Sequence, residues 1–271
     1  MRWTRARPST NVDDRRGLGP VALGGGLGAV LLTLLAIVFG VNPRIVQPGD
    51  RAAPPTAPAD DEGARFARAI LGSTEDVWTE LFRARGARYS PPTLVLFTGT
   101  VASGCGVAGA AVGPFYCPRD ATVYLDLGFF DDLARLGAPG DFARAYVVAH
   151  EVGHHVQNLL GVTERARAAQ ETASSRAAAN AVSVRVELMA DCLAGVWAHH
   201  AQQRLQWLEP GEARQALDAA AAIGDDRLQR RAQGTVVPES FTHGTSEQRV
   251  DWFRRGFDRG DPTACDTFAA S

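Results

Sequence analysis

The chain has 271 residues, with 28 basic against 30 acidic side chains and a hydrophobic content of 45%. This length and apolar content suffice for one sizeable globular domain or two small ones. The nearly even charge balance lacks the basic excess that marks nucleic-acid-binding domains, so we expect no nucleic-acid partner.

An apolar stretch follows a polar, arginine-rich start. Residues 18–41 form about 24 positions without a charge, close to the length that crosses the hydrocarbon core of a bilayer. Five arginines precede this stretch and two follow it closely, so the positive-inside rule places residues 1–17 in the cytoplasm. We therefore expect one transmembrane helix at 18–41, a single-pass topology and an extracytoplasmic main domain.

A cleaved signal peptide is the alternative, because a charged start followed by an apolar run has the same pattern. The long apolar stretch and the 17-residue polar lead favour the anchor, and no pair of small residues stands cleanly after the apolar core.

Four cysteines suit an exported location, where disulfides persist. Three pairings are possible. Cys105 and Cys117 flank a Gly-rich loop of the kind that a short bridge would pin, which leaves Cys192 to reach Cys265. A tetracysteine zinc site is the alternative, but no C-x-x-C pair supports it.

Residues 42–63 are rich in Pro and Ala and lack apolar periodicity, which predicts an extended linker before a domain at 64–271. Apolar residues at helical spacing in 64–86 predict two helices separated by a turn at Gly72-Ser73-Thr74. Segments 93–97 and 121–127 have the composition of strands and predict a small sheet or hairpin around a Gly-rich loop.

Asp141 is a suitable N-cap for a helix that Gly161 ends, and this helix has the strongest pattern in the chain. Further helices are predicted at 176–208, 210–231 and 246–257. Together these elements predict an α+β domain that is mainly helical and contains a small sheet.

The sequence His150-Glu151-Val152-Gly153-His154 lies inside that strongest helix. Histidines four residues apart share one face of a helix, so both imidazoles can reach one ion. Glu151 is placed to take a proton from a water molecule that zinc has made more acidic. The pattern indicates a hydrolytic zinc site with His150 and His154 as ligands and Glu151 as general base. A helix with surface histidines is the alternative.

A catalytic zinc ion needs three protein ligands and one open position. The extended motif with a third histidine fails, because Leu160 and Gln157 occupy its expected His and Gly positions. On the next helix, Glu187 and Asp191 stand four residues apart on an apolar face, where buried carboxylates need partners. We expect Glu187 to be the third ligand and Asp191 to accept the outer N–H of a ligating histidine. An exposed pair, or an ion pair of Glu187 with Arg185, is the alternative.

His243 lies in the loop before the last helix and is a candidate catalytic residue, because a loop histidine beside zinc can donate a hydrogen bond to a developing oxyanion. Arg249 is placed to do the same or to hold the loop. Structural capping is the alternative for both. We expect His155, His199 and His200 to be structural, because their helical positions face away from the predicted site.

The motifs together resemble the bacterial neutral zinc metallopeptidases that carry one N-terminal membrane anchor. The matching strings lie at residues 2–3, 9–17, 103–106, 113–118, 123–127, 150–157, 187–198 and 240–249. The resemblance covers nearly the whole chain. It implies a gluzincin-like domain, a zinc ion as cofactor, a peptide or protein substrate and the bacterial cell membrane as location. It leaves the physiological substrate and the oligomeric state open.

In zincins generally, the substrate lies extended beside an edge strand near the metal. The Gly-rich residues 107–116 are the candidate for that strand here, because they allow close backbone approach. A plain disulfide-pinned loop is the alternative.

We therefore expect a membrane-anchored zinc metalloendopeptidase in which Glu151 takes a proton from water and passes it to the leaving amine. One alternative is a zinc-binding scaffold or sensor without peptidase activity, against which Glu151 argues because zinc binding alone does not need it. The other is a zinc amidase that acts on cell-wall material.

Overall fold

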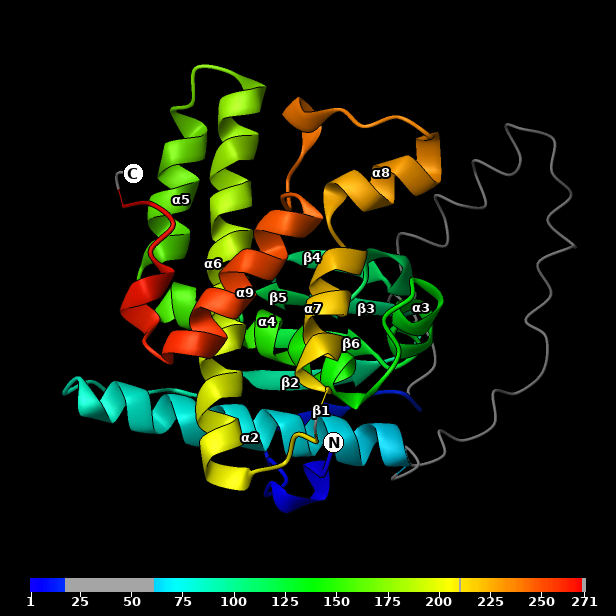
Figure 1. The fold of residues 1–271 in the computed structure, drawn as a ribbon, viewed down its shortest axis with the longest axis vertical. Coiled ribbons are helices and arrows are strands. Elements are labelled where there is room, and N and C mark those ends of the chain that lie inside the picture. The colour runs from blue at the N-terminus through cyan, green and yellow to red at the C-terminus, as the bar shows by residue number, and fades with distance from the viewer. Residues whose placement is uncertain (18–60, 210, 270–271) are drawn as a thin grey trace, which may run out of the picture.

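The computed structural model describes residues 1–17, 61–209 and 211–269, which form a mainly helical α+β domain around a small sheet (Figure 1). The predicted fold class is thereby confirmed at this level. The helices are α2 (Glu62–Ala84), α3 (Phe129–Arg135), α4 (Asp141–Leu159), α5 (Val162–Glu171), α6 (Arg176–Leu205), α7 (Ala213–Ala222), α8 (Asp225–Gln233) and α9 (Ser246–Arg259). The strands are β1 (Val12–Asp14), β2 (Thr93–Phe97), β3 (Thr100–Ser103), β4 (Gly106–Gly109), β5 (Phe115–Cys117) and β6 (Thr122–Asp126). Short 3-10 turns cover Trp3–Arg5, Ala110–Val112, Pro238–Ser240 and Pro262–Cys265.

The main sheet has the strand order β1-β2-β6-β5, in which only the edge strand β5 runs antiparallel to its neighbour. The strands predicted at 93–97 and 121–127 are confirmed as β2 and β6, which pair in parallel rather than as a hairpin. Leu94, Val95, Leu96 and Phe97 of β2 are all buried, as expected for a central strand that is covered on both faces. The Gly-rich loop between them forms its own hairpin from β3 and β4.

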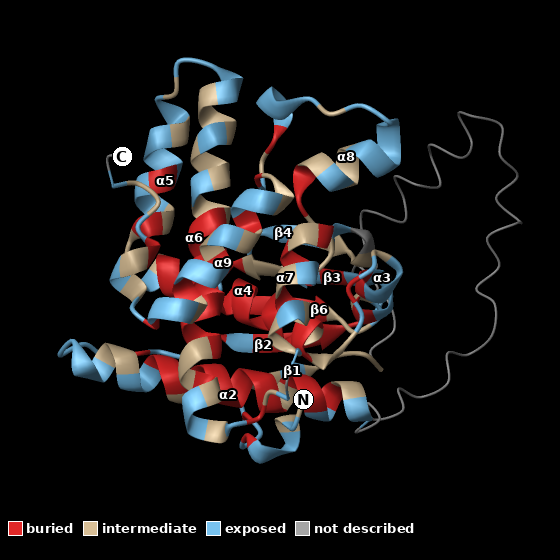
Figure 2. Ribbon diagram, in the orientation of Figure 1, coloured by how far each residue is buried: buried red, intermediate tan, exposed pale blue. Residues whose placement is uncertain are grey.

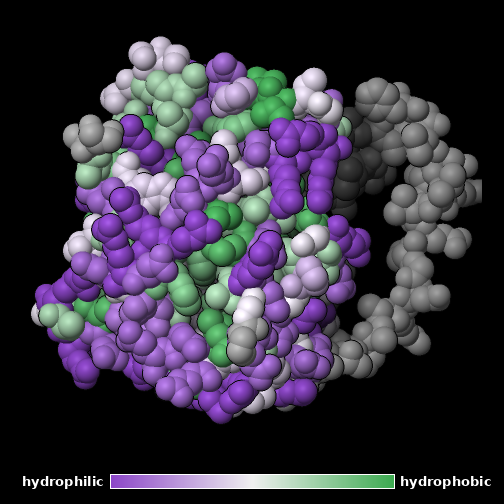
Figure 3. Space-filling view, viewed as in Figure 1, coloured by the Kyte–Doolittle hydropathy of each residue, from purple (hydrophilic) through white to green (hydrophobic). Residues whose placement is uncertain are grey.

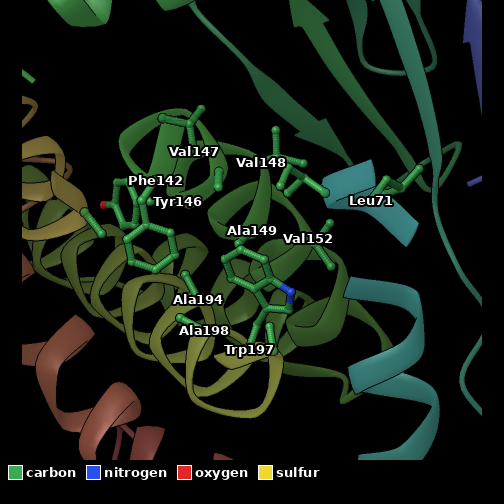
Figure 4. Close-up of a cluster of buried hydrophobic side chains, with 14 of the residues drawn as sticks. Leu71, Phe142, Tyr146, Val147, Val148, Ala149, Val152, Ala194, Trp197 and Ala198 are labelled. Atoms are coloured by element: carbon green, nitrogen blue, oxygen red, sulfur yellow. The ribbon is translucent and has the colours of Figure 1, made fainter. Parts of the chain in front are cut away.

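The core lies where α4 packs against α6 and α2 (Figures 1 and 2). Figure 4 shows this cluster, in which the rings of Phe142 and Trp197 stack at 6.3 Å between centroids. Ala194 and Ala198 lie beside them and keep the two helices close. Hydrophilic side chains cover most of the face in Figure 3, with apolar residues gathered near its centre. The His150–His154 motif thus lies on a helix, α4, that is packed into this core.

Helix α9 crosses α6 so closely that the two backbones are in contact. A Cβ atom added to Gly195 would lie 2.1 Å from the carbonyl oxygen of Phe253, so only glycine fits at that crossing. Thr245 and Gln248 form a capping box that begins α9 and sets the position of Arg249. This close crossing brings the start of α9 to the cavity described below.

One continuous helix, α2, replaces the two helices predicted in 64–86. That prediction is wrong because Gly72 does not form a turn. It lies in the helix interior, where a Cβ atom would be 2.1 Å from the carbonyl oxygen of Arg7. The glycine is needed for the approach of another part of the backbone.

Residues 1–17 belong to this domain. Strand β1 pairs in parallel with β2, and the amide of Arg15 donates to the carbonyl oxygen of Leu96 at 2.8 Å. The predicted domain boundary near Ala64 therefore misses the first strand of the sheet, and residues 1–17 are not a separate segment.

The predicted transmembrane helix at 18–41 and nearly all of the predicted linker at 42–63 lie outside the described residues. Among the residues that the structure does describe, no helix combines the length and the hydropathy needed to span a bilayer.

The helix predicted at 210–231 is wrong, because α7 and α8 are separate helices. Between them Ser246 of α9 donates a hydrogen bond to the carbonyl oxygen of Ala221 and contacts Asp226 at 2.8 Å. The other long helices match their predictions to within a few residues: α4 ends before Gly161 and α6 ends at Leu205, where the chain turns left-handed at Gln206.

All four cysteines form disulfides, Cys105 with Cys117 and Cys192 with Cys265. This is the pairing that the sequence favoured among three. The first bridge joins the turn between β3 and β4 to strand β5, across 12 positions, and the second ties α6 to the C-terminal turn across 73 positions.

Replacing Cys192 and Cys265 by Ser is expected to cost about 4 kcal/mol of unfolding free energy, and replacing Cys105 and Cys117 about 3 kcal/mol, because the longer loop gains more freedom in the unfolded chain. Urea unfolding of both double variants measures this. An unchanged midpoint for the Cys192/Cys265 variant would contradict the expectation.

Candidate metal centre

A cavity of about 610 Å³ opens between α4, α6, β5 and the chain around residues 223–249. Its wall combines apolar side chains with most of the polar residues that the sequence singled out. The charged and amide residues in the wall are His150, Glu151, His154, Gln157, Glu187, His243 and Arg249.

His150, His154 and Glu187 converge at one point of this cavity. One ligand atom from each lies within 4.8 Å of the other two. The Nε2 atom of His150 is 3.2 Å from one carboxylate oxygen of Glu187, and the Nε2 atom of His154 is 3.4 Å from the other. Two imidazoles and a carboxylate around an open cavity are the donor set of a three-ligand catalytic zinc site, so these residues fit the ion.

Both histidines are held through their outer Nδ1 atoms. The Nδ1 atom of His150 lies 2.8 Å from Asp191, as the spacing on α6 predicts, and that of His154 lies 2.9 Å from the amide oxygen of Gln157. Since each outer nitrogen faces an oxygen acceptor, Nδ1 carries the proton of the neutral ring, and Nε2 is the nitrogen that can bind a metal once any second proton is displaced. Gln157 also donates to the carbonyl oxygen of Val186 at 2.6 Å and so ties α4 to α6.

Gln157 is a site residue that the sequence analysis missed. Its only signal was its position three residues after His154, on the same side of the helix.

Asp191 is the centre of a buried polar cluster. Both of its oxygens bind Arg249, at 2.8 Å through Nε and 3.0 Å through Nη2, and Tyr146 donates its hydroxyl to the same carboxylate. Asp191 and Arg249 are 0% and 2% exposed. Burial raises the pKa of Asp191, but the charges of Arg249 and His150 outweigh it and leave the pKa below its usual value. Arg249 is therefore a charged partner of Asp191 rather than a loose loop residue.

When no ion is bound, the neighbouring carboxylates favour the protonated forms of His150 and His154. Burial lowers the pKa of His150, but the adjacent Asp191 outweighs it and raises the pKa to about 10. Burial also lowers the pKa of His154, and Glu187 more than compensates. A metal ion that binds at neutral pH must displace these protons.

His243 lines the cavity from the loop between α8 and α9 and is half exposed. Its Nδ1 atom is 3.1 Å from Asp225, and the hydrogen bond to this carboxylate is the main cause that raises the pKa of His243. Asp225 also accepts the backbone amides of Thr242, His243 and Gly244, so it shapes the loop as well as the ring. The sequence analysis missed Asp225, whose position at a helix start was hidden in the predicted 210–231 helix.

Glu151 is 8% exposed and lines the cavity one residue after His150. The remaining histidines have structural partners, as expected: His155 contacts Tyr116 and the carbonyl oxygen of Ser90, and His199 and His200 contact carbonyl oxygens at the end of α9. Arg185 stacks over Phe268, so the alternative ion pair with Glu187 is absent among the described contacts.

The family described as "Putative neutral zinc metallopeptidase" matches residues 1–268. The chain belongs to this family. A relative from Escherichia coli K12, named "Uncharacterized protein YpfJ", is 48% identical over 288 aligned positions that cover all of both chains. The protein "Uncharacterized protein Rv2575" of Mycobacterium tuberculosis H37Rv is 47% identical over 210 positions, covering 73% of this chain and 68% of its own. No solved structure matches the chain. The resemblance seen in the sequence is thus confirmed at the level of the family.

Gln157→Met is expected to weaken zinc affinity about 10-fold to 100-fold, because His154 loses the acceptor that fixes its ring. Competition with a chromophoric chelator measures this. The matched control is Asn158→Ala, since the Asn158 amide contacts Tyr116 rather than a ligand. Equal affinities for the two variants would contradict the role of Gln157.

Zinc binding at pH 7 is expected to release protons, because the pKa values of His150 and His154 are raised in the ion-free protein. Titration calorimetry in buffers with different ionisation enthalpies measures the number released. Affinity should fall as the pH falls. A binding heat that is the same in all buffers would contradict the expectation.

Proposed function

We propose that this protein is a zinc-dependent metalloendopeptidase with a gluzincin-like site, in which His150, His154 and Glu187 hold the ion and Glu151 is the general base. The observation that carries the proposal is the convergence of the three ligand atoms in one cavity that Glu151 also lines. The family to which the chain belongs supports the same chemistry.

A zinc ion in this site would polarise the substrate carbonyl and make water acidic enough to attack it. Glu151 takes the proton from the attacking water and gives it to the leaving amine. His243, held by Asp225, donates from its Nε2 atom to the oxyanion that develops on the carbonyl. Asp191 and Gln157 keep the two imidazoles oriented throughout, and Arg249 neutralises Asp191.

The substrate is proposed to lie along β5, which is the edge strand of the sheet on the cavity side. Residues 107–116 were named from the sequence as the candidate strand for substrate binding. The first part of this range, β4, pairs with β3 and lies outside the main sheet, so the proposed binding strand is residues 113–117. Apolar side chains line the cavity beside this strand and favour apolar peptide side chains. They include Val112, Phe115, Phe129, Leu136, Ile223 and Leu228.

An extracytoplasmic location for the domain is part of the proposal. It is supported by the two disulfides, since such bonds persist in oxidising compartments. Membrane attachment through residues 18–41 is also proposed, from their length and apolar character alone.

Glu151→Gln is expected to keep zinc and lower the rate of casein cleavage about 10²-fold to 10⁴-fold, because only the proton transfer is lost. Glu187→Ala is expected to lose zinc, since one of three ligands is removed. Metal analysis and cleavage of unfolded casein by the full chain test both variants beside the wild type.

A Glu187→Ala variant that holds zinc as the wild type does would contradict the ligand assignment. If the wild type holds one zinc ion and cleaves no protein substrate, the scaffold or sensor alternative moves ahead. Release of amino groups from peptidoglycan without cleavage of casein would favour a cell-wall amidase.

Asp225→Asn is expected to lower kcat about tenfold or more and to move the high-pH limb of the kcat profile to lower pH. The sign follows from His243: its Nε2–H can donate only while the ring is protonated, and Asp225 raises its pKa. The control is Asp226→Asn, because Asp226 binds Ser246 instead. A reduced kcat with an unshifted limb would show that Asp225 acts only on the loop.

A further inference from the structure

The first 17 residues pack against residues 61–269, which are called the zinc domain below, and fit their surface closely. The amide of Leu94 donates to the carbonyl oxygen of Asn11, and the amide of Ser9 donates to that of Arg68, at 2.8 and 2.9 Å. Ser9 is 3% exposed. At Gly72 of α2 the carbonyl oxygen of Arg7 takes the space that any side chain would need. In Figure 1 the segment runs along α2 and the sheet.

A buried carboxylate on α2 depends on the same segment. Glu75 is 4% exposed and accepts hydrogen bonds from Arg7, Ser9 and Asn11 at 2.6–2.7 Å. All three partners lie in the first 17 residues. Without this segment the carboxylate would lose the groups that compensate its burial, which is costly for a charged side chain.

The arginines that suggest a cytoplasmic N-terminus are used in this docking. Arg2 pairs with Glu209, and Arg5 donates to the carbonyl oxygens at the end of α6. Arg7 pairs with Glu75 and Asp76. The last two arginines of the segment, Arg15 and Arg16, pair with Asp13 and Asp14. All five arginines of the segment thus have partners within the fold.

The two ends of the stretch between residues 17 and 61 meet in an ion pair. Arg16 contacts Asp61 at 2.6 Å, and Asp61 at the same time caps α2 by accepting the amide of Ala64. The chain thus leaves the domain and re-enters it at one place.

We infer that residues 1–17 and the zinc domain lie on the same side of the membrane, as two parts of one folded unit. A chain that leaves and returns at one place cannot cross a bilayer an odd number of times in between. About 24 apolar residues suffice for one helical crossing and are too few for two. Any membrane contact of this stretch therefore begins and ends on the side of the zinc site.

Thiol labelling of the full chain in Escherichia coli spheroplasts tests the inference. All native cysteines are in disulfides, so Thr10→Cys and Arg214→Cys each add one reactive thiol at an exposed position. A membrane-impermeant maleimide is expected to label both to the same fraction of the total measured after denaturation. Labelling of Arg214→Cys together with protection of Thr10→Cys would overturn the inference.

Equal protection of both thiols would support the shared side but overturn the extracytoplasmic location. The inference does not rest on peptidase activity, so loss of the proposed function would leave these outcomes unchanged.

Gly72→Ala gives a second, independent readout on the purified full chain. If residues 1–17 were not docked on α2, this change would raise stability, because alanine favours a helix interior more than glycine does. With Arg7 docked, the added methyl group clashes and the urea midpoint is expected to fall, with faster labelling of Thr10→Cys in the double variant. A raised midpoint would overturn the docking.

Discussion

The ion pair between Asp191 and Arg249 is the interaction on which the site depends. It joins three helices far apart in sequence: α6 carries the carboxylate, α9 the guanidinium, and α4 the imidazole of His150 that the carboxylate also binds. Burying either charge alone would be prohibitive, so neither can take its position unless the other is present. The pair therefore fixes how far α4 and α6 are shifted along each other. That shift decides whether both Nε2 atoms face Glu187.

The two histidines are held by acceptors of different charge. His150 faces a carboxylate that Arg249 already neutralises, whereas His154 faces the neutral amide of Gln157. Glu187 and Glu151 are thus the carboxylates at the candidate metal site whose charge no arginine balances in the described contacts. A divalent cation would compensate them, and a neutral partner such as Gln157 avoids adding a further negative charge to the site.

Local patterns in the sequence were enough for the strands β2 and β6, the helices α4, α6 and α9, and the grouping of His150, His154 and Glu187. The elements and the His150–His154 pair rest on spacing within one element, and spacing along a helix translates directly into geometry. Glu187, on another helix, was added because a zinc site needs a third ligand and a buried carboxylate needs a partner. The features that were missed depend on contacts between distant parts of the chain. Gly72, followed by Ser73 and Thr74, has the sequence pattern of a turn. Only its contact with Arg7 explains why a glycine stands inside the helix. Asp225 cannot be distinguished from any surface carboxylate until the loop carrying His243 folds onto it. Strand β1 is three residues long and gains its stability from β2.

The completion of the site depends on the last part of the chain. The three candidate ligands lie between residues 150 and 187, but Arg249 comes much later, and the Cys192–Cys265 bridge closes later still. During synthesis, a nascent or truncated chain would already contain every candidate ligand while Asp191 still lacked its counter-charge. A site finished in this order is incomplete until the C-terminal part of the chain has folded onto α6.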